Sequence, residues 1–354
     1  MVVAMMLSAA SCSKPENIEE TTVPTTIIES TTVAVTESAV ANPQRFKPIA
    51  DITDADSVKS LIKEWATNGG DCLNNTDITN ILLIGEDYVD GSSRSDAAII
   101  MSINRKTKSI TLTSVLRDSY TYMNINGQDR FDKTNHSYSW GGPEKLVEVI
   151  SADYKIIINA YAVVNFESFV QAVDEIGGVS VMVTDAEADY MNKTKGVSTF
   201  KSGQNVRLNG EQALYFVRIR KLDGEPERTE RQRRLIKAYI NELKSLSQEE
   251  KENAVASLFP YVTTSYTEIE LLTLAAEAFS GNWLDFDIIS ETAPSAENRR
   301  SFRGYKTYTG NLDIWVVDYI RAARDLQLLI YGETNIMLEE NHVSAIDLAL
   351  KSKY

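Results

Sequence analysis

Residues 80–104 place the strongest constraint on what this chain can fold into. Within them, an apolar run at 81–84 ends at Gly85, and a second apolar run occupies 97–103. Short apolar runs that are bounded by turn-forming residues are typical of buried strands. The pattern therefore predicts two core strands joined by a loop.

The predicted loop is acidic and contains glycine. It places Asp87 and Asp96 near the strand ends, with Arg94 two residues before the second carboxylate. Two carboxylates that converge at the mouth of a sheet suit a hard cation such as Mg²⁺, which prefers oxygen ligands. Taken by itself, however, the segment is explained more simply as a solvated loop whose acids keep the protein soluble.

A third strand is expected at 110–118, and its last residues include Arg117. The polar residues 104–109 form a turn before it, so 99–103 and 110–116 should pair as an antiparallel hairpin. Arg117 would then leave its strand close to the acidic loop.

The rest of the chain alternates strands and helices, which indicates an α/β sandwich with a mixed sheet. A loop that carries His136 is expected at 131–142, and a polar, mobile flap is expected at 185–204. A capping-box-like sequence at Asn209 predicts the start of a short helix. Further helices are expected at 57–65, 144–150, 166–176, 228–246, 264–278 and 319–329, and further strands at 156–164, 179–183, 215–220 and 314–317.

A basic island follows the flap in an otherwise acidic chain. On the expected strand 215–220, Arg218 and Arg220 would point to the same face. Arg228, Arg231 and Gln232 lie at helical spacing on one face of the next helix, near its positive N-terminal end. Paired arginines beside a helix N-terminus favour a phosphate group. A solvated helix face is the alternative, but it suits these arginines poorly because they lie on a strand or above an apolar stripe.

Composition excludes several classes of protein. The formal net charge is −14, with 50 acidic and 36 basic residues, so the chain is a poor candidate for nucleic-acid binding. The 2 cysteines, Cys12 and Cys72, and the 2 histidines, His136 and His342, exclude an ordinary zinc cluster and a disulfide framework. Neither histidine lies near a nucleophile elbow, and a structural role for His136 is the simpler interpretation. The chemistry must therefore depend on carboxylates, arginines, hydroxyls and a metal.

The N-terminal part differs in composition from the rest. Small residues just before Cys12 resemble a lipoprotein signal, which would lipidate that cysteine and anchor the chain to a membrane. A truncated transmembrane or secretory segment is the alternative. The expected organisation is a signal segment at 1–12, a disordered Thr/Ser/Glu-rich tether at 13–45, a lead-in at 46–78, one catalytic domain at 79–333 and a C-terminal tail at 334–354.

Taken together, these pieces resemble the LytR-CpsA-Psr (LCP) family of cell-wall ligases. The resemblance covers most of the chain and rests on motifs that occur in order with plausible spacing. The first four are the N-I-L-L-x-G-x-D strand at 80–87, the R-S-D loop at 94–96, the R-D strand end at 117–118 and the K-x-N-H-S-Y-x-x-G-G segment at 133–142. The others are N-F at 165–166, D-x-I-G-G-V at 174–179, the L-N-G-E-Q-A-L helix start at 208–214, and R-x-R with E-R-x-x-R-Q within 218–232.

The resemblance implies an α/β/α sandwich with helices on both faces of a mixed sheet and an apolar lipid pocket. It also implies a phosphotransferase that moves a glycopolymer from an undecaprenyl-pyrophosphate donor to peptidoglycan, at the outer face of a bacterial membrane. Carried over by motif, Asp87 and Asp96 would hold Mg²⁺ or Mn²⁺, and Arg94 would support that loop. The pyrophosphate would be bound by Arg117, Arg218, Arg220, Arg228, Arg231 and Gln232. The catalytic residues would be Asp96, Arg94, Arg117 and Arg220.

Several interpretations stay open at this point. Asp118 is a candidate general base, but it could equally be a structural partner of an arginine. Phe166, Phe169 and Ile236 could line the lipid pocket or belong to the core. The alternative functions are a non-catalytic lipoprotein that binds polyprenyl phosphate or glycan, a polyprenyl pyrophosphatase, and a transcriptional regulator, which the charge and the absence of a basic recognition helix disfavour.

Overall fold

The computed structural model describes residues 55–89, 91–256, 261–338 and 342–351. The predicted signal segment at 1–12, including Cys12, and the tether at 13–45 lie outside these described residues. Within the described part, no helix is both long and apolar enough to cross a membrane.

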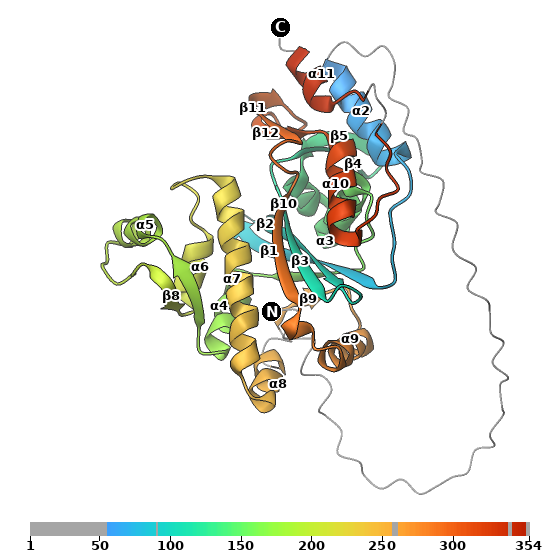
Figure 1. The fold of residues 1–354 in the computed structure, drawn as a ribbon. Coiled ribbons are helices and arrows are strands. Elements are labelled where there is room, and N and C mark those ends of the chain that lie inside the picture. The colour runs from blue at the N-terminus through green and yellow to red at the C-terminus, as the bar shows by residue number, and fades with distance from the viewer. Residues whose placement is uncertain (1–54, 90, 257–260, 339–341, 352–354) are drawn as a thin grey trace, which may run out of the picture.

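A six-stranded sheet forms the centre of the molecule (Figure 1), in the order β10-β3-β2-β1-β6-β9. The first three strands in the chain pair antiparallel, whereas β6 runs parallel to β1 and β10 runs parallel to β3. The predicted mixed sheet and the hairpin of 99–103 with 110–116 are therefore confirmed. The strands are β1 (Ile78–Val89), β2 (Ser92–Asn104), β3 (Ser109–Val115), β6 (Ala160–Val164), β9 (Thr263–Thr264) and β10 (Asp287–Ala293).

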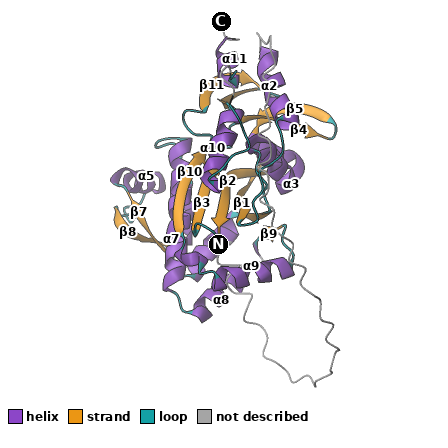
Figure 2. Ribbon diagram, turned by 45° about the vertical axis from the view of Figure 1, so that its right-hand side comes forward, coloured by secondary structure: helices purple, strands orange, loops and turns teal. Residues whose placement is uncertain are grey.

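Helices cover both faces of this sheet, as Figures 1 and 2 show. On β1, Leu82 and Ile84 belong to a core shared with α2 (Ala55–Asn68), α3 (Thr134–Tyr154), α10 (Tyr319–Tyr331) and α11 (Ala345–Lys351). On the opposite face, Ile81 packs with residues of α9 (Glu268–Ser280) and α7 (Glu225–Ser245). This alternation follows from the two-residue period of a strand, so the predicted sandwich is confirmed.

The remaining elements form smaller units around the sheet. Two hairpins and one further strand pair are separate from it. These elements are β4 (Tyr120–Ile125) with β5 (Gln128–Lys133), β11 (Arg299–Lys306) with β12 (Asn311–Val317), β7 (Val179–Val183) with β8 (Gly203–Leu208), α4 (Phe166–Glu175), α5 (Asp185–Lys195), α6 (Gly210–Val217), α8 (Gln248–Ala256) and the 3-10 helix η3 (Trp283–Asp285).

The strand predicted at 215–220 is wrong, because α6 continues to Val217 and Arg218 caps it. The capping box of Asn209 and Gln212 starts this helix, and Ala213, Phe216 and Val217 give it a buried stripe at helical spacing. Arg218 and Arg220 therefore lie in the turn after a helix. The alternating polar residues at 218–220 reflect that turn and not a strand.

The flap predicted at 185–204 is also wrong, because it contains α5 and the start of β8. A second capping box, from Thr184 and Glu187, begins α5, and Ala188 and Met191 bury one side of it. The polar residues that suggested a flap are the exposed face of this short helix.

The loop predicted at 131–142 is wrong as well. Strand β5 extends to Lys133, and α3 begins directly at Thr134, so that His136 lies in the first turn of a helix. The helix is kinked where Gly141 and Gly142 leave helical backbone angles, and Pro143 starts its second half. The glycine pair therefore interrupts the helix without ending it.

Candidate functional site

The acidic stretch at 87–96 is an extended hairpin and not a loop. Strands β1 and β2 pair out to Val89 and Ser92, with one register shift. Gly85 pairs with Ala97 and Glu86 with Ser95, which leaves Asp96 as the extra residue of a bulge in β2. A bulge re-aims side chains near active sites.

The bulge explains why Asp96 faces the site. Strict alternation would place it on the same face as Ala98 and Ile100, which belong to the core shared with α3. Instead Asp96 and Ala97 both line a cavity on the other face. Gly85 permits this close pairing, because a Cβ atom there would lie 3.1 Å from the Cβ of Ala97.

The cavity has a volume of about 330 Å³ and is lined mainly by apolar side chains. Strands β1, β2 and β6 form one wall, and helices α4, α6 and α7 form the others. Phe166, Phe169 and Ile236 are among the lining residues, and Phe169 and Ile236 also pack against the apolar core, so the two interpretations left open for them are compatible. The other apolar lining residues are Leu83, Ile84, Ile99, Met101, Val164, Ala172, Val173, Leu214, Val217, Leu235, Tyr239 and Ile240.

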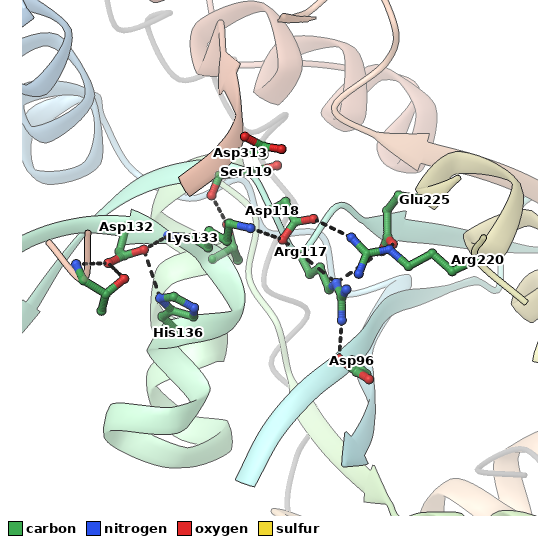
Figure 3. Close-up of polar contacts among 12 residues, drawn as sticks. Asp96, Arg117, Asp118, Ser119, Asp132, Lys133, His136, Arg220, Glu225 and Asp313 are labelled. Atoms are coloured by element: carbon green, nitrogen blue, oxygen red, sulfur yellow. Dashed lines mark hydrogen bonds and ion pairs between the residues drawn. The ribbon is translucent and has the colours of Figure 1, made fainter. Parts of the chain in front are cut away.

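Charged side chains form one cluster at the cavity, which we call the charged mouth. Its members that line the cavity are Asp96, Arg117, Arg218, Arg220 and Arg228, and the carboxylates that pair with these arginines are Asp87, Asp118 and Glu225. Arg117 pairs with Asp96, and its Nε lies 3.5 Å from Glu225 Oε1 (Figure 3). Arg220 reaches Asp118 at 3.4 Å and Glu225 at 3.2 Å. The structure thus brings together the end of β3, the turn after α6 and the first turn of α7.

Arg228 is the most enclosed arginine of the charged mouth, with 7% of its side chain exposed. It pairs with Glu225 and donates a hydrogen bond of 2.8 Å to the carbonyl oxygen of Asp96. Burial lowers the pKa of Arg228, and the Glu225 carboxylate opposes that shift. Since arginine stays protonated in proteins, this position keeps a buried positive charge at the mouth.

Arg218 is more open, with 52% of its side chain exposed. Its guanidinium lies 4.2 Å from the ring centroid of Phe166, and its Nη2 is 3.9 Å from Oδ2 of Asp87. Asp87 therefore contacts a half-exposed arginine that lines the cavity.

Other predicted site residues are placed differently. Gln232 lines the cavity, and its buried Oε1 has no hydrogen-bond partner within the described structure. Arg94 is exposed on β2 opposite Asp87 and does not line the cavity. Arg231 is 1% exposed and pairs with Glu187 of α5 at 2.8 Å and with Asp223, outside the cavity lining.

Glu225 is a residue of the charged mouth that the sequence did not predict. It contacts three arginines of the mouth. The only signal for it in the sequence is its place as an acidic residue in the first turn of an arginine-rich helix. Asp118 accepts from Lys133 at 2.9 Å and from Arg220, which agrees with its interpretation as a structural partner.

The segment 133–142 supports the hairpin from the side. Tyr138 donates to Glu86 at 2.9 Å, and Ser139 donates to the carbonyl of Ser93 at 3.0 Å. The Asn135 amide donates to the carbonyl of Arg117 at 3.2 Å. The start of α3 therefore fixes both the acidic hairpin and the strand end that carries Arg117.

Among the described residues, no group of three or more His, Cys, Asp or Glu side chains is arranged to hold a metal ion. Mg²⁺ usually takes one or two carboxylates and completes its shell with water and substrate phosphates. Asp87 and Asp96 lie on paired strands, and each contacts an arginine of the charged mouth, so the site has the number of carboxylates that such an ion needs.

Comparisons with known proteins agree with this arrangement. The LytR_cpsA_psr family model matches residues 13–311. A "Polyisoprenyl-teichoic acid–peptidoglycan teichoic acid transferase TagU" of Oceanobacillus iheyensis is 41% identical over 180 residues, which is 48% of this chain and 53% of the relative. Its counterpart of the same name in Bacillus subtilis is 36% identical over 178 residues, 49% of this chain and 55% of the relative. The chain thus spans about half the length of the curated relatives it matches.

Solved structures share the fold. "TagT bound to LIIa-WTA" matches with a TM-score of 0.59 and 23% identity, over 75% of this chain and 98% of the other. "LytR-CPS2A-psr family protein YwtF (TagT) with bound octaprenyl pyrophosphate lipid" matches with a TM-score of 0.53 and 24% identity, over 73% of this chain and 92% of the other. With the family model matched across residues 13–311, the chain belongs to the LytR_cpsA_psr family.

Proposed function

We propose that this protein is a Mg²⁺-dependent phosphotransferase that moves a glycopolymer from a polyprenyl-pyrophosphate donor to peptidoglycan. The observation that carries the proposal is the joining of an apolar cavity to a mouth lined by Arg117, Arg218, Arg220 and Arg228. A ligand that fills both parts must have a long apolar chain and a multiply charged anionic group. A prenyl pyrophosphate has this character.

The relatives support the same substrate class. A related structure is described with a bound octaprenyl pyrophosphate lipid, and the curated relatives are named as polyisoprenyl-teichoic acid–peptidoglycan transferases. For this chain, both the donor and the peptidoglycan acceptor are part of the proposal, which covers any lipid-linked glycopolymer of the cell wall or capsule as the donor.

In the proposed reaction, the arginines act mainly by charge neutralisation. The acceptor hydroxyl attacks the phosphorus that carries the glycopolymer, and the bond to the bridging oxygen breaks, so that the lipid phosphate leaves with the electron pair. Arg117 and Arg220 would bind the pyrophosphate oxygens, and the buried charge of Arg228 would stabilise the negative charge that grows on the leaving group.

Asp87 and Asp96 would hold the Mg²⁺ ion, with Mn²⁺ as a substitute. When bound, the ion would supply further positive charge against the pyrophosphate. Without a ligand, Asp96 pairs with Arg117, so donor binding would exchange this contact for contacts to phosphate. Arg94 would act from outside the cavity, through the charge balance of the hairpin that it shares with Asp87.

The proposed location is the outer face of a bacterial membrane, with the N-terminal part, through Cys12, as the anchor. A peptidoglycan acceptor requires this side of the membrane. Cells that express the protein can be grown with a radiolabelled fatty acid, and the label on the protein measured. The Cys12→Ala variant is the control, and it should carry no label if Cys12 is the lipidated residue.

The decisive experiment measures transfer by the full chain from a prenyl-pyrophosphoryl saccharide to peptidoglycan fragments, with and without Mg²⁺. The variants are Asp96→Asn and Arg117→Ala, and the exposed Arg324→Ala serves as the matched control. The proposal expects Mg²⁺-dependent release of prenyl phosphate with labelling of the acceptor, lost in both site variants and kept in the control. Release without acceptor labelling would indicate a pyrophosphatase instead. Binding without turnover would indicate a non-catalytic lipid-binding protein.

A further inference from the structure

A second pair of titratable side chains lies beside the charged mouth and has no part in the proposal so far. His136 Nδ1 lies 2.9 Å from Oδ1 of Asp132. The carboxylate is completely buried, whereas 26% of the histidine side chain is exposed. Figure 3 shows the pair next to Lys133, whose ammonium group reaches Asp118 at 2.9 Å.

Asp132 is held in place from several sides. Its Oδ1 accepts from the amide of Lys133 at 2.8 Å, and its Oδ2 accepts from the amide and the hydroxyl of Thr309, both at 2.8 Å. Burial by itself would raise the pKa of Asp132, but the hydrogen bonds from His136, the Lys133 amide and Thr309 hold that pKa below its usual value. Asp132 is therefore a fixed, charged partner for the imidazole.

A fixed carboxylate at Nδ1 determines the chemistry of the other ring nitrogen. The close contact favours the tautomer in which Nδ1 carries the proton, which leaves the lone pair on Nε2. A histidine oriented by a buried carboxylate, with its second nitrogen available, is the arrangement of a general base.

Main-chain and side-chain contacts tie this pair to the charged mouth. Asn135, the residue directly before His136, donates its amide to the carbonyl of Arg117 at 3.2 Å. Lys133, directly after Asp132, pairs with Asp118, which also binds Arg220. The chain neighbours of His136 therefore contact both the strand end that carries Arg117 and the carboxylate that binds Arg220, and Figure 3 shows the imidazole beside Lys133.

The surface next to His136 is aromatic and open. The Trp140 ring lies edge-on to His136, with 5.7 Å between the ring centroids, and 5.6 Å from the ring of Tyr308, which is 53% exposed. Arg130 stacks on both rings, at 4.6 and 4.4 Å. Aromatic surfaces with polar edges suit the C–H faces and hydroxyls of a sugar ring.

We propose that His136 is the general base of the transfer reaction, and that the aromatic surface around it receives the acceptor glycan. This inference rests on the proposed function. Nε2 takes the proton of the acceptor hydroxyl as the hydroxyl oxygen forms its bond to phosphorus. The bond from phosphorus to the bridging oxygen breaks, the lipid phosphate leaves with the electron pair, and His136 later gives the proton to water.

The carboxylates of the mouth are less suited to this role. Asp96, Asp118 and Glu225 are each paired with at least one arginine, so their carboxyl oxygens are already engaged within the mouth. The other histidine of the chain, His342, is 6% exposed and pairs with Asp318 at 2.7 Å. His342 therefore offers a matched control, a histidine–aspartate pair without access to the mouth.

The test uses the full chain and compares His136→Gln, His136→Ala and the control His342→Gln. Initial transfer rates are measured between pH 5 and pH 9, with donor binding measured separately. The charged and titratable groups around His136 are Asp132 and Lys133, together with Arg130 and Tyr308, which contact Trp140. A base accepts a proton only in its neutral form, so a histidine base is expected to give the rate profile an acidic limb, a rise of the rate with pH.

We expect His136→Gln to lower the transfer rate by about 10²–10⁴-fold, the usual contribution of a positioned base, with donor affinity unchanged. The rise of the rate with pH on the acidic side should disappear. Added imidazole should restore part of the activity of His136→Ala, which a purely structural role would not produce. His342→Gln should transfer at the wild-type rate.

The inference and the proposed function fail in different ways. If His136→Gln transfers at the wild-type rate, or keeps the acidic limb, then His136 is not the base, although the protein is a transferase. If the wild-type protein binds the donor but labels no acceptor at any pH, the proposed function is overturned and the inference with it.

Discussion

Arg228 donates a hydrogen bond of 2.8 Å from its guanidinium to the main-chain carbonyl of Asp96, joining helix α7 to the bulge of strand β2. The contact couples the position of a predicted metal ligand to that of a buried positive charge. Because the acceptor is a backbone atom, the side-chain carboxylate of Asp96 is left to meet Arg117 or a ligand.

Replacing Arg228 with alanine should destabilise the fold by about 2–3 kcal/mol, because it leaves Glu225 buried without its nearest partner. The cost should fall below the usual range for a broken buried pair, since Arg117 and Arg220 still lie 3.5 and 3.2 Å from Glu225. Urea unfolding measures this difference in the free energy of unfolding.

The exposed Arg324→Ala, which loses only a contact of 3.7 Å to Asp325, is the matched control for that measurement. It should change the free energy of unfolding by less than about 0.5 kcal/mol. If Arg228→Ala is as stable as this control, Arg228 does not hold the bulge in place.

Arg218 should affect ligand binding and not stability. Its side chain is half exposed, and its contacts to Phe166 and Asp87 are a stacking contact and a long ion pair. Arg218→Ala should therefore weaken binding of a prenyl pyrophosphate by about 10–100-fold, the value of one charge-assisted hydrogen bond, without a change in melting temperature.

Arg207→Ala provides the comparison for Arg218, because Arg207 is also about half exposed and paired, at 2.6 Å with Glu242, but lies on β8 away from the cavity. Titration calorimetry on both variants separates the two cases. Equal affinities for the prenyl pyrophosphate would show that Arg218 does not contact the phosphates.

The strands were predictable because their burial follows the two-residue period directly. Ile81 and Leu82 alternate between the two faces of the sheet, and the apolar runs at 81–84 and 97–103 lie inside the two strands, which extend beyond them to Val89 and Ser92. The orientation of Asp96 was not predictable in the same way. It depends on a register shift opposite Gly85 and Glu86, which is a property of two paired strands and not of either sequence segment.

The partners of the arginines were also not predictable from one segment of the sequence. Arg228 and Arg231 lie three residues apart on one helix, and the sequence groups them on a single face. In the structure Arg231 forms an ion pair with Glu187 of α5. The polar composition of this helix had indicated a flap. Helical spacing therefore predicted the shared face of the two arginines. It did not predict the ion pair of Arg231, because Glu187 belongs to a helix that the sequence pattern did not indicate.

Filling the cavity should shorten the lipid that it accepts. Leu214 lies on α6, is partly buried and lines the cavity, so Leu214→Trp adds volume inside it. We expect binding of a long prenyl pyrophosphate to weaken by tenfold or more, since each methylene that loses its burial costs about 0.8 kcal/mol. Geranyl pyrophosphate, which needs less of the cavity, should bind as before.

Leu246→Trp is the control for this change, because Leu246 is also partly buried and lies outside the cavity lining. A competition assay with prenyl pyrophosphates of different lengths reports the change. If Leu214→Trp binds long and short lipids as the wild type does, the chain does not occupy this part of the cavity.

The stability of the fold should fall as the pH rises, because of one buried carboxyl group away from the site. Asp153 is a buried residue of α3, and the hydroxyl of Thr121 on β4 lies 2.8 Å from both of its carboxyl oxygens. Burial raises the pKa of Asp153 to about 8, against the lowering effect of that hydrogen bond. In the unfolded chain the same group has a pKa of about 3.9.

The sign of the effect follows from these two values. Below about pH 4 both states bind the proton, and the stability is complete. From there to about pH 8 the unfolded chain releases the proton while the folded protein keeps it, so stability falls by up to about 1.4 kcal/mol per pH unit. Asp153→Asn should flatten this slope in urea unfolding curves between pH 4 and pH 8, whereas the exposed Asp285→Asn should keep it. An unchanged slope in Asp153→Asn would mean that Asp153 is ionised in the folded protein at neutral pH.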